Sequence, residues 1–159
     1  MIELKDLTEE VAIAAAGWRN DSPESCRTDK PSTVESQKDW FSKLNYRSDM
    51  VYWTVESNGI PVGIGGLTGI TDWCAEISIV IDPTARGKGI GKTAVDLILE
   101  AGFGMGLKVI YGEVYKCSPA MTFWHHILEK YSPKWSWLPN RKMFQGEIYD
   151  SEYFSIGGL

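Results

Sequence analysis

The segment from Ala75 to Lys92 constrains the fold more than any other part of the chain. It reads AEISIVIDPTARGKGIGK, a run rich in β-branched residues that stops at Pro83 and continues into a loop with glycines at positions 87, 89 and 91. Branched residues favour a strand, and glycines let the main chain approach a ligand without a Cβ in the way. A helix that follows such a loop presents unpaired N–H groups and the positive end of its dipole. The segment therefore predicts a strand, an anion-binding loop and a helix.

Three cations lie in this loop, namely Arg86, Lys88 and Lys92. Basic residues normally stabilise the end of a helix and acidic residues its start, so this placement is unfavourable unless an anion binds there. We expect a pyrophosphate site over residues 86–92, although a plain turn with solvated lysines would read similarly. The spacing differs from that of a P-loop and lacks the last glycine of the dinucleotide-binding fingerprint.

The remaining sequence predicts a mixed α/β layout. Expected strands cover residues 1–7, 50–56, 61–68, 74–81, 108–115, 134–144 and 148–156, and expected helices cover 8–18, 32–44, 89–104 and 119–131. Thr8 starts the first helix, and Ser32 with Glu35 resembles a capping box at the second. Asn58 and Gly59 predict a hairpin turn, since both tolerate positive φ. The helix between the fourth and fifth strands makes these two strands parallel, and ligands bind beyond the carboxyl ends of such strands.

Length and composition agree with one compact domain over residues 1–159. The net charge of −5 disfavours nonspecific nucleic-acid binding, and the sequence has no apolar run of membrane-spanning length. Cys26, Cys74 and Cys117 are odd in number and widely spaced, which favours reduced thiols in the cytoplasm. His125 and His126 are adjacent and therefore point to different faces of a helix, so no metal site is expected.

The Arg86-x-x-Gly89-x-Gly91 pattern resembles motif A of the GNAT (Gcn5-related N-acetyltransferase) superfamily. The strand before it and the helix after it, together with Trp18 and Trp40 early in the chain, are similar to the branch that contains ribosomal-protein and amino-sugar acetyltransferases. The resemblance implies the GNAT fold: a mixed, mostly antiparallel sheet of about six to seven strands, with parallel, splayed strands four and five, flanked by about four helices.

The resemblance also implies acetyl-CoA as co-substrate, with no metal. The pantetheine arm would pair as an added strand with main-chain groups of Ser78, Ile79, Val80 and Ile81. The pyrophosphate would meet the amides of Gly87, Lys88, Gly89, Ile90, Gly91 and Lys92, with Arg86 beside it.

Direct acetyl transfer to an amine needs a base and a proton for the departing thiolate. Glu76 is the only acid inside the fourth strand and is the candidate base, although it could equally be a structural glutamate bonded to an arginine or water. The family's usual Asn and Tyr positions hold Cys117 and Trp124, which would then contact the coenzyme. Because an indole N–H cannot supply a proton at neutral pH, Tyr115, His125 or solvent would be the acid.

The function expected from these features is N-acetylation of a primary amine on a small molecule, such as an amino sugar or a polyamine. Two alternatives stay open: a peptide or protein N-terminal acetyltransferase, and an inactive acyl-CoA-binding sensor. A homodimer is compatible with either reading. Candidate walls for the acceptor lie outside the motif, namely Trp18, Arg19, Asn20, Asp21, the loop to Lys30, Trp73, Trp135, Trp137, Tyr149 and Tyr153.

Overall fold

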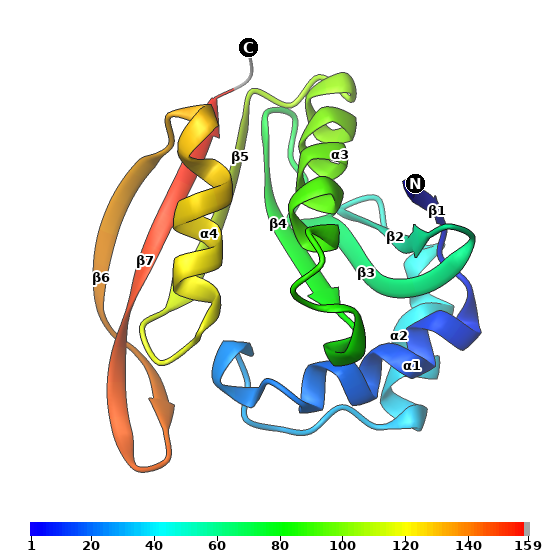
Figure 1. Cartoon of the computed structure of the whole chain (residues 1–159), viewed down its shortest axis with the longest axis horizontal. Helices are drawn as coiled ribbons and strands as arrows, with labels where there is room; N and C mark the ends of the chain where they lie inside the picture. The colour runs from blue at the N-terminus through cyan, green and yellow to red at the C-terminus, as the bar shows by residue number, and fades with distance from the viewer. Residues whose placement is uncertain (158–159) are drawn as a thin grey trace.

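The order of helices and strands matches the one expected from the sequence. In the computed structural model, which describes residues 1–157, the chain forms one seven-stranded sheet with helices on both faces (Figure 1). The strands are β1 (Ile2–Asp6), β2 (Met50–Ser57), β3 (Ile60–Thr68), β4 (Cys74–Ile81), β5 (Val109–Tyr115), β6 (Lys134–Phe144) and β7 (Glu147–Gly157). The helices are α1 (Glu9–Asn20), α2 (Val34–Leu44), α3 (Ile90–Gly104) and α4 (Ala120–Leu128), with short 3-10 turns η1 (Pro23–Ser25), η2 (Pro83–Ala85) and η3 (Glu129–Tyr131).

The sheet contains one parallel pair, and that pair comes apart. Its strand order is β1-β2-β3-β4-β5-β7-β6, and neighbours are antiparallel except for β4 and β5. These two pair only from Cys74 to Glu76 on β4. Beyond Glu76 the two strands continue without pairing to each other and separate, as Figure 1 shows. The predicted mixed sheet with splayed parallel fourth and fifth strands is confirmed.

Alternation along β4 sends its side chains to two different helix layers. Ile77 packs with Ile98 of α3 in the main core, whereas Val80 packs with Val11 and Ala15 of α1. Because successive strand residues point to opposite faces, the apolar run of β4 can bury both sides at once. Helices thus hold β4 from both faces, while the edge of β4 that faces β5 stays unpaired beyond Glu76.

The start of α2 differs from the expected capping box by one residue. Thr33, not Ser32, is the N-cap: its Oγ1 accepts from the Ser36 amide at 3.0 Å, and Ser36 Oγ accepts from the Thr33 amide at 2.8 Å. Ser32 instead uses its main chain, exchanging two 2.8 Å bonds with the Asn20 side chain. The prediction was wrong because the sequence does not show that the end of α1 bonds Ser32.

Two hairpin turns have positive φ angles at both central residues, and the first of them was expected from the sequence. Asn58 and Gly59 between β2 and β3 both have positive φ, at 52° and 78°, as a two-residue hairpin turn requires. Gln145 and Gly146 repeat this geometry between β6 and β7, at 51° and 81°. Among residues 1–157, no helix is both long and apolar enough to cross a membrane.

Candidate active site

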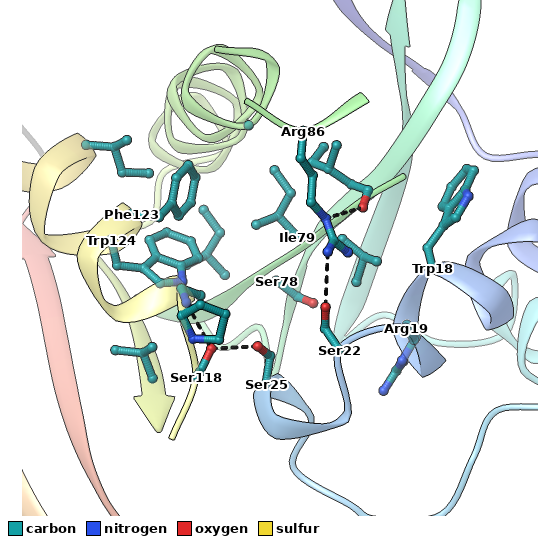
Figure 2. A pocket seen from close by; sticks show the side chains of 18 of the residues that line it. Trp18, Arg19, Ser22, Ser25, Ser78, Ile79, Arg86, Ser118, Phe123 and Trp124 are labelled. Carbon is teal, nitrogen blue, oxygen red and sulfur yellow. Dashed lines mark hydrogen bonds between the residues drawn. The ribbon is translucent and has the colours of Figure 1, made fainter. Parts of the chain in front are cut away.

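A cleft of about 800 Å³ opens where β4 and β5 separate. β4, the loop before α3, the start of α4 and the end of α1 contribute its walls (Figure 2). The predicted site residues that line it are Glu76, Ser78, Ile79, Val80, Ile81, Arg86, Gly87, Gly89, Ile90, Gly91, Lys92, Tyr115 and Trp124. The cleft therefore brings together most of the residues singled out from the sequence.

The free edge of β4 presents main-chain groups to the cleft. The carbonyl oxygens of Ser78 and Val80 point toward β3, since they lie 3.5 and 2.6 Å from where a Cβ on Gly65 or Gly63 would stand. By alternation, the N–H and C=O groups of Ile79 and Ile81 face the gap instead. An extended ligand can therefore pair with β4 here through Ile79.

The loop before α3 forms an open cradle of amides. Gly87 and Gly89 have φ of 76° and 77°, and a Cβ added to either would meet nothing within 4 Å. Gly89 is the N-cap of α3, and no side chain caps this end of the helix. The first N–H groups of α3 are thus directed at open space beside the cleft, which suits an anion.

Arg86 is already engaged by its own chain. Its guanidinium donates to the Ile81 carbonyl at 3.1 Å, to Asp21 Oδ2 at 3.1 Å and to Ser22 Oγ at 3.2 Å. Figure 2 shows it spanning from the loop to Ser22 across one side of the cleft. Arg86 therefore ties β4 to the end of α1, a use of its charge that the sequence did not indicate.

Two predicted coenzyme residues do not line the cleft. Lys88 Nζ donates to the Thr84 carbonyl at 3.4 Å. Cys117 donates its thiol to the Glu24 carbonyl at 3.4 Å, and burial raises the pKa of this thiol. The neighbouring Ser118 lines the cleft instead. The turn after β5 points the Cys117 side chain away from the cleft. Cys117 therefore makes a structural contact with Glu24.

The candidate base Glu76 lies in an ion pair. Arg27 Nη2 is 2.6 Å from Glu76 Oε1 and 3.8 Å from Glu113 Oε2. Burial by itself would lower the pKa of Arg27, but Tyr115 and Glu76 raise it above its ordinary value. Glu76 Oε2 accepts no hydrogen bond from any residue between 1 and 157, so one oxygen of this carboxylate has no partner within the chain.

Glu113 stands beside Glu76 on the opposite strand of the gap. Its side chain is only 7% exposed, and Oε1 accepts from Arg141 Nε at 2.8 Å and from Ser151 Oγ at 2.7 Å. Burial alone would raise the pKa of this carboxyl, but the bonds from Arg141 and Ser151 hold it below its ordinary value. Glu113 is therefore ionised and fully committed to its partners at neutral pH.

The aromatic residues of the cleft divide between core and wall. Trp124 is 9% exposed and packs on Phe154 with ring centroids 5.1 Å apart, so it is mainly a core residue with one edge in the cleft. Tyr115 is 5% exposed and also lines the cleft. Trp18 and Arg19 line the far side, whereas Trp73 and Trp137 are 57% and 59% exposed and take no part in the cleft. Trp135, Tyr149 and Tyr153 lie outside it too.

Residues 21–30, part of the loop expected to wall the acceptor site, form a segment that we call the strap, and its Ser22, Ser25, Cys26 and Arg27 line the cleft. The strap runs from the end of α1 toward the start of α4 (Figure 1), where Ser25 Oγ meets Ser118 Oγ at 2.6 Å. Lys142 of β6 holds it from below, donating to the Cys26 carbonyl at 2.6 Å. The strap carries Arg27, and nothing in its polar, irregular sequence indicates these distant contacts. Within residues 1–157, no group of His, Cys, Asp or Glu side chains has the arrangement of a metal site.

A comparison with known protein families identifies the family of this chain. The sequence model of the acetyltransferase (GNAT) family matches residues 13–130, a span that includes the free edge of β4, the glycine loop and α4. The chain belongs to the GNAT acetyltransferase family. The resemblance and the enzyme class inferred from the sequence are thereby confirmed.

Solved structures of GNAT enzymes share the whole fold. Spermidine N-acetyltransferase from Vibrio cholerae, solved with CoA and spermine, has a TM-score of 0.88 at 18% identity, over 99% of this chain and 95% of that one. Ribosomal-protein-alanine N-acetyltransferase from Brucella melitensis has 0.81 at 17%, over 99% of both chains. A phosphinothricin acetyltransferase from Sinorhizobium meliloti, solved with acetyl-CoA, has 0.80 at 15%, over 98% and 89%. A comparison with curated protein sequences found no match.

Proposed function

We propose that this GNAT protein transfers an acetyl group from acetyl-CoA directly to a primary amine of a small molecule. The observation that carries the proposal is the opening between β4 and β5, with an uncapped helix start at one end and a carboxylate at the other. Structural neighbours solved with CoA and spermine, or with acetyl-CoA, support it. We propose further that residues 1–159 are one domain. The cytoplasmic location and the homodimer stay predictions.

The coenzyme end of the site fits a pyrophosphate. The open space above Gly87 and Gly89 is where a Cβ would otherwise stand, and the amides of Ile90 to Lys92 begin α3 without a side-chain cap. The pantetheine arm would pair with the main chain of Ile79, since the Ile81 carbonyl already accepts from Arg86. The acetyl group would then lie near Glu76, at the point where the strands separate.

The chemistry follows from the position of Glu76. Its free Oε2 takes a proton from the ammonium of the acceptor, directly or through water, and the amine nitrogen then attacks the thioester carbon. The C–N bond forms and the C–S bond breaks. The thiolate takes a proton from the Tyr115 hydroxyl or from solvent, and the second proton that the nitrogen loses as it becomes an amide returns to Tyr115 or goes to solvent. Trp124 cannot supply that proton because an indole does not ionise near neutral pH; it packs and positions.

Two other functions fit parts of the same site. An inactive sensor is favoured by Trp124, which replaces the phenol of the family pattern. A peptide N-terminal acetyltransferase is favoured by the fold it shares with the ribosomal-protein-alanine enzyme. Coenzyme binding without CoA release from any amine would establish the sensor, and release only with peptides would establish the peptide enzyme.

A pair of glycine substitutions tests the coenzyme site. We expect Gly89→Val to abolish acetyl-CoA binding in calorimetry, because the side chain occupies the place of the anion and fills the cradle. Gly106→Val is the matched control: Gly106 also has positive φ, at 96°, and open space around its Cβ, but it follows α3 away from the cleft. Both variants carry similar backbone strain, so equal affinity in the two would contradict the assignment.

A further inference from the structure

The acceptor end of the cleft carries more cations than anions. Arg19, Arg27, Glu76 and Glu113 line it, and Arg141 is bonded to Glu113 from outside the cleft. Both carboxylates are already neutralised, Glu76 by Arg27 at 2.6 Å and Glu113 by Arg141 at 2.8 Å. Two glutamates therefore face three guanidinium groups, and the local charge is positive.

Arg19 is the surplus cation. Among the described residues it forms no ion pair, and Figure 2 shows it extending from α1 beside Trp18, across the cleft from Trp124. Arg27 follows Cys26, whose thiol donates to the Arg19 carbonyl at 3.7 Å, and both arginines line the cleft. Arg19 and Arg27 therefore lie at the same end of the cleft.

This charge pattern discriminates among amines. A diamine or polyamine that places one amine on Glu76 Oε2 carries a second ammonium group, which needs a further carboxylate. Glu113 is already paired with Arg141, and Arg19 adds a further cation nearby. Like charges repel, the more so where water is partly excluded. An acceptor that also carries a carboxylate would place its amine on Glu76 Oε2 and its anion on the guanidinium groups, which bind carboxylates through forked N–H bonds.

We propose that the acceptor is a zwitterion, a primary amine bearing a carboxylate as amino acids do, and that Arg19 and Arg27 bind that carboxylate. This inference rests on the proposed function and deepens it. Arg27 then has two tasks, since it orders Glu76 from one side and recognises the acceptor from the other. Arg19 only recognises the acceptor, so a substitution there tests recognition without disturbing Glu76.

The experiment compares matched amines by CoA release. Lysine, lysine amide and 1,5-diaminopentane share one carbon chain and differ in the carboxylate, and 4-aminobutanoate with butylamine gives a second pair. For the native protein we expect kcat/KM to favour the carboxylate-bearing member of each set by about tenfold or more. In Arg19→Gln the preference should fall to about twofold, with acetyl-CoA affinity unchanged as evidence of an intact fold.

Arg27→Gln should do more than remove the preference. It leaves Glu76 without its counter-ion, so the diamine should gain on lysine and become the better acceptor. Arg47→Gln is the control, because Arg47 forms an exposed ion pair with Asp49 outside the cleft and should leave every ratio unchanged.

The outcomes separate the two proposals. If the native protein prefers 1,5-diaminopentane or spermidine to the carboxylate-bearing amines, the zwitterion inference is wrong and amine acetylation stands. An Arg19→Gln variant that binds acetyl-CoA and keeps the native preference also overturns the inference. If acetyl-CoA binds and no amine releases CoA, the proposed function is itself wrong, and the inference is overturned with it.

Discussion

Lys142 anchors the strap to β6. Only 2% of its side chain is exposed, and Nζ donates to the Cys26 carbonyl at 2.6 Å and to Asp29 Oδ1 at 3.0 Å. The register of β6 shifts between Leu138 and Lys142, and the ammonium lies 5.6 Å from the centre of the Tyr115 ring. Replacing Lys142 by Met keeps the long apolar stem and removes the charge.

The cost of this change can be worked out from its two partners. The Cys26 carbonyl is part-buried and loses its donor, which costs about 1–3 kcal/mol. The Asp29 side chain is 67% exposed and returns to water, so that bond was worth less than about 1 kcal/mol. We expect Lys142→Met to lower the free energy of unfolding by about 2 kcal/mol, or about 4–8 °C in Tm for a chain of this size.

Urea denaturation of two variants measures this difference. Lys43→Met is the matched control, since Lys43 Nζ also stands 2.6 Å from a carboxylate, that of Asp39, but both side chains are 64% exposed. We expect a loss of about 0.5 kcal/mol or less there. Equal losses in the two variants would refute the reasoning, because burial would then add nothing to the Lys142 contact.

Three further predictions concern the floor of the cleft. Glu76→Gln should lower kcat by about a hundredfold to ten-thousandfold at neutral pH and leave acetyl-CoA affinity unchanged by calorimetry; native turnover would make Glu76 structural. Trp124→Phe should cost about 1–2 kcal/mol in urea denaturation, since the ring packs on Phe154, and keep kcat within about tenfold; loss of turnover in a folded variant would mean that the indole N–H acts in the transition state. Glu113→Gln should destabilise the protein by about 2 kcal/mol at pH 7 through the bonds lost from Arg141 and Ser151. The folded-state pKa of Glu113 lies below its ordinary 4.5, so the carboxylate stabilises the protein above that pH and ceases to do so as the pH falls through the folded-state value. The difference between the native protein and Glu113→Gln should therefore shrink from pH 7 to pH 3, and a constant difference would contradict the sign.

The strands and helices were predictable wherever a local signal was strong. β4 was predicted at its observed bounds, because its branched residues end at Pro83, and α3 within one residue, because Gly89 in its left-handed conformation starts the helix. The turn at Asn58 and Gly59 needed only the tolerance of these residues for positive φ. In each case the information lies within a few consecutive residues.

The contacts that define the acceptor end were not predictable in this way. Arg27 meets Glu76 across 49 positions of sequence, and Lys142 meets Cys26 across 116. Neither pair has a spacing that a helix or strand imposes, and the strap that carries Arg27 and Cys26 has no repeating apolar pattern. Only the closing of the sheet, with β7 beside β5 and β6 outside it, brings Lys142 under the strap.

The reversed charge at the start of α3 had two explanations, a bound anion or contacts within the chain, and the structure divides the three cations between them. Arg86 is satisfied by Asp21 and the Ile81 carbonyl, and Lys88 donates to the Thr84 carbonyl. Lys92 lines the cleft and forms no ion pair with any residue from 1 to 157. The case for an anion therefore rests on Lys92 and the uncapped amides rather than on three charges. Because Arg86 bonds both β4 and the strap, it also fixes the coenzyme edge and the acceptor end relative to one another.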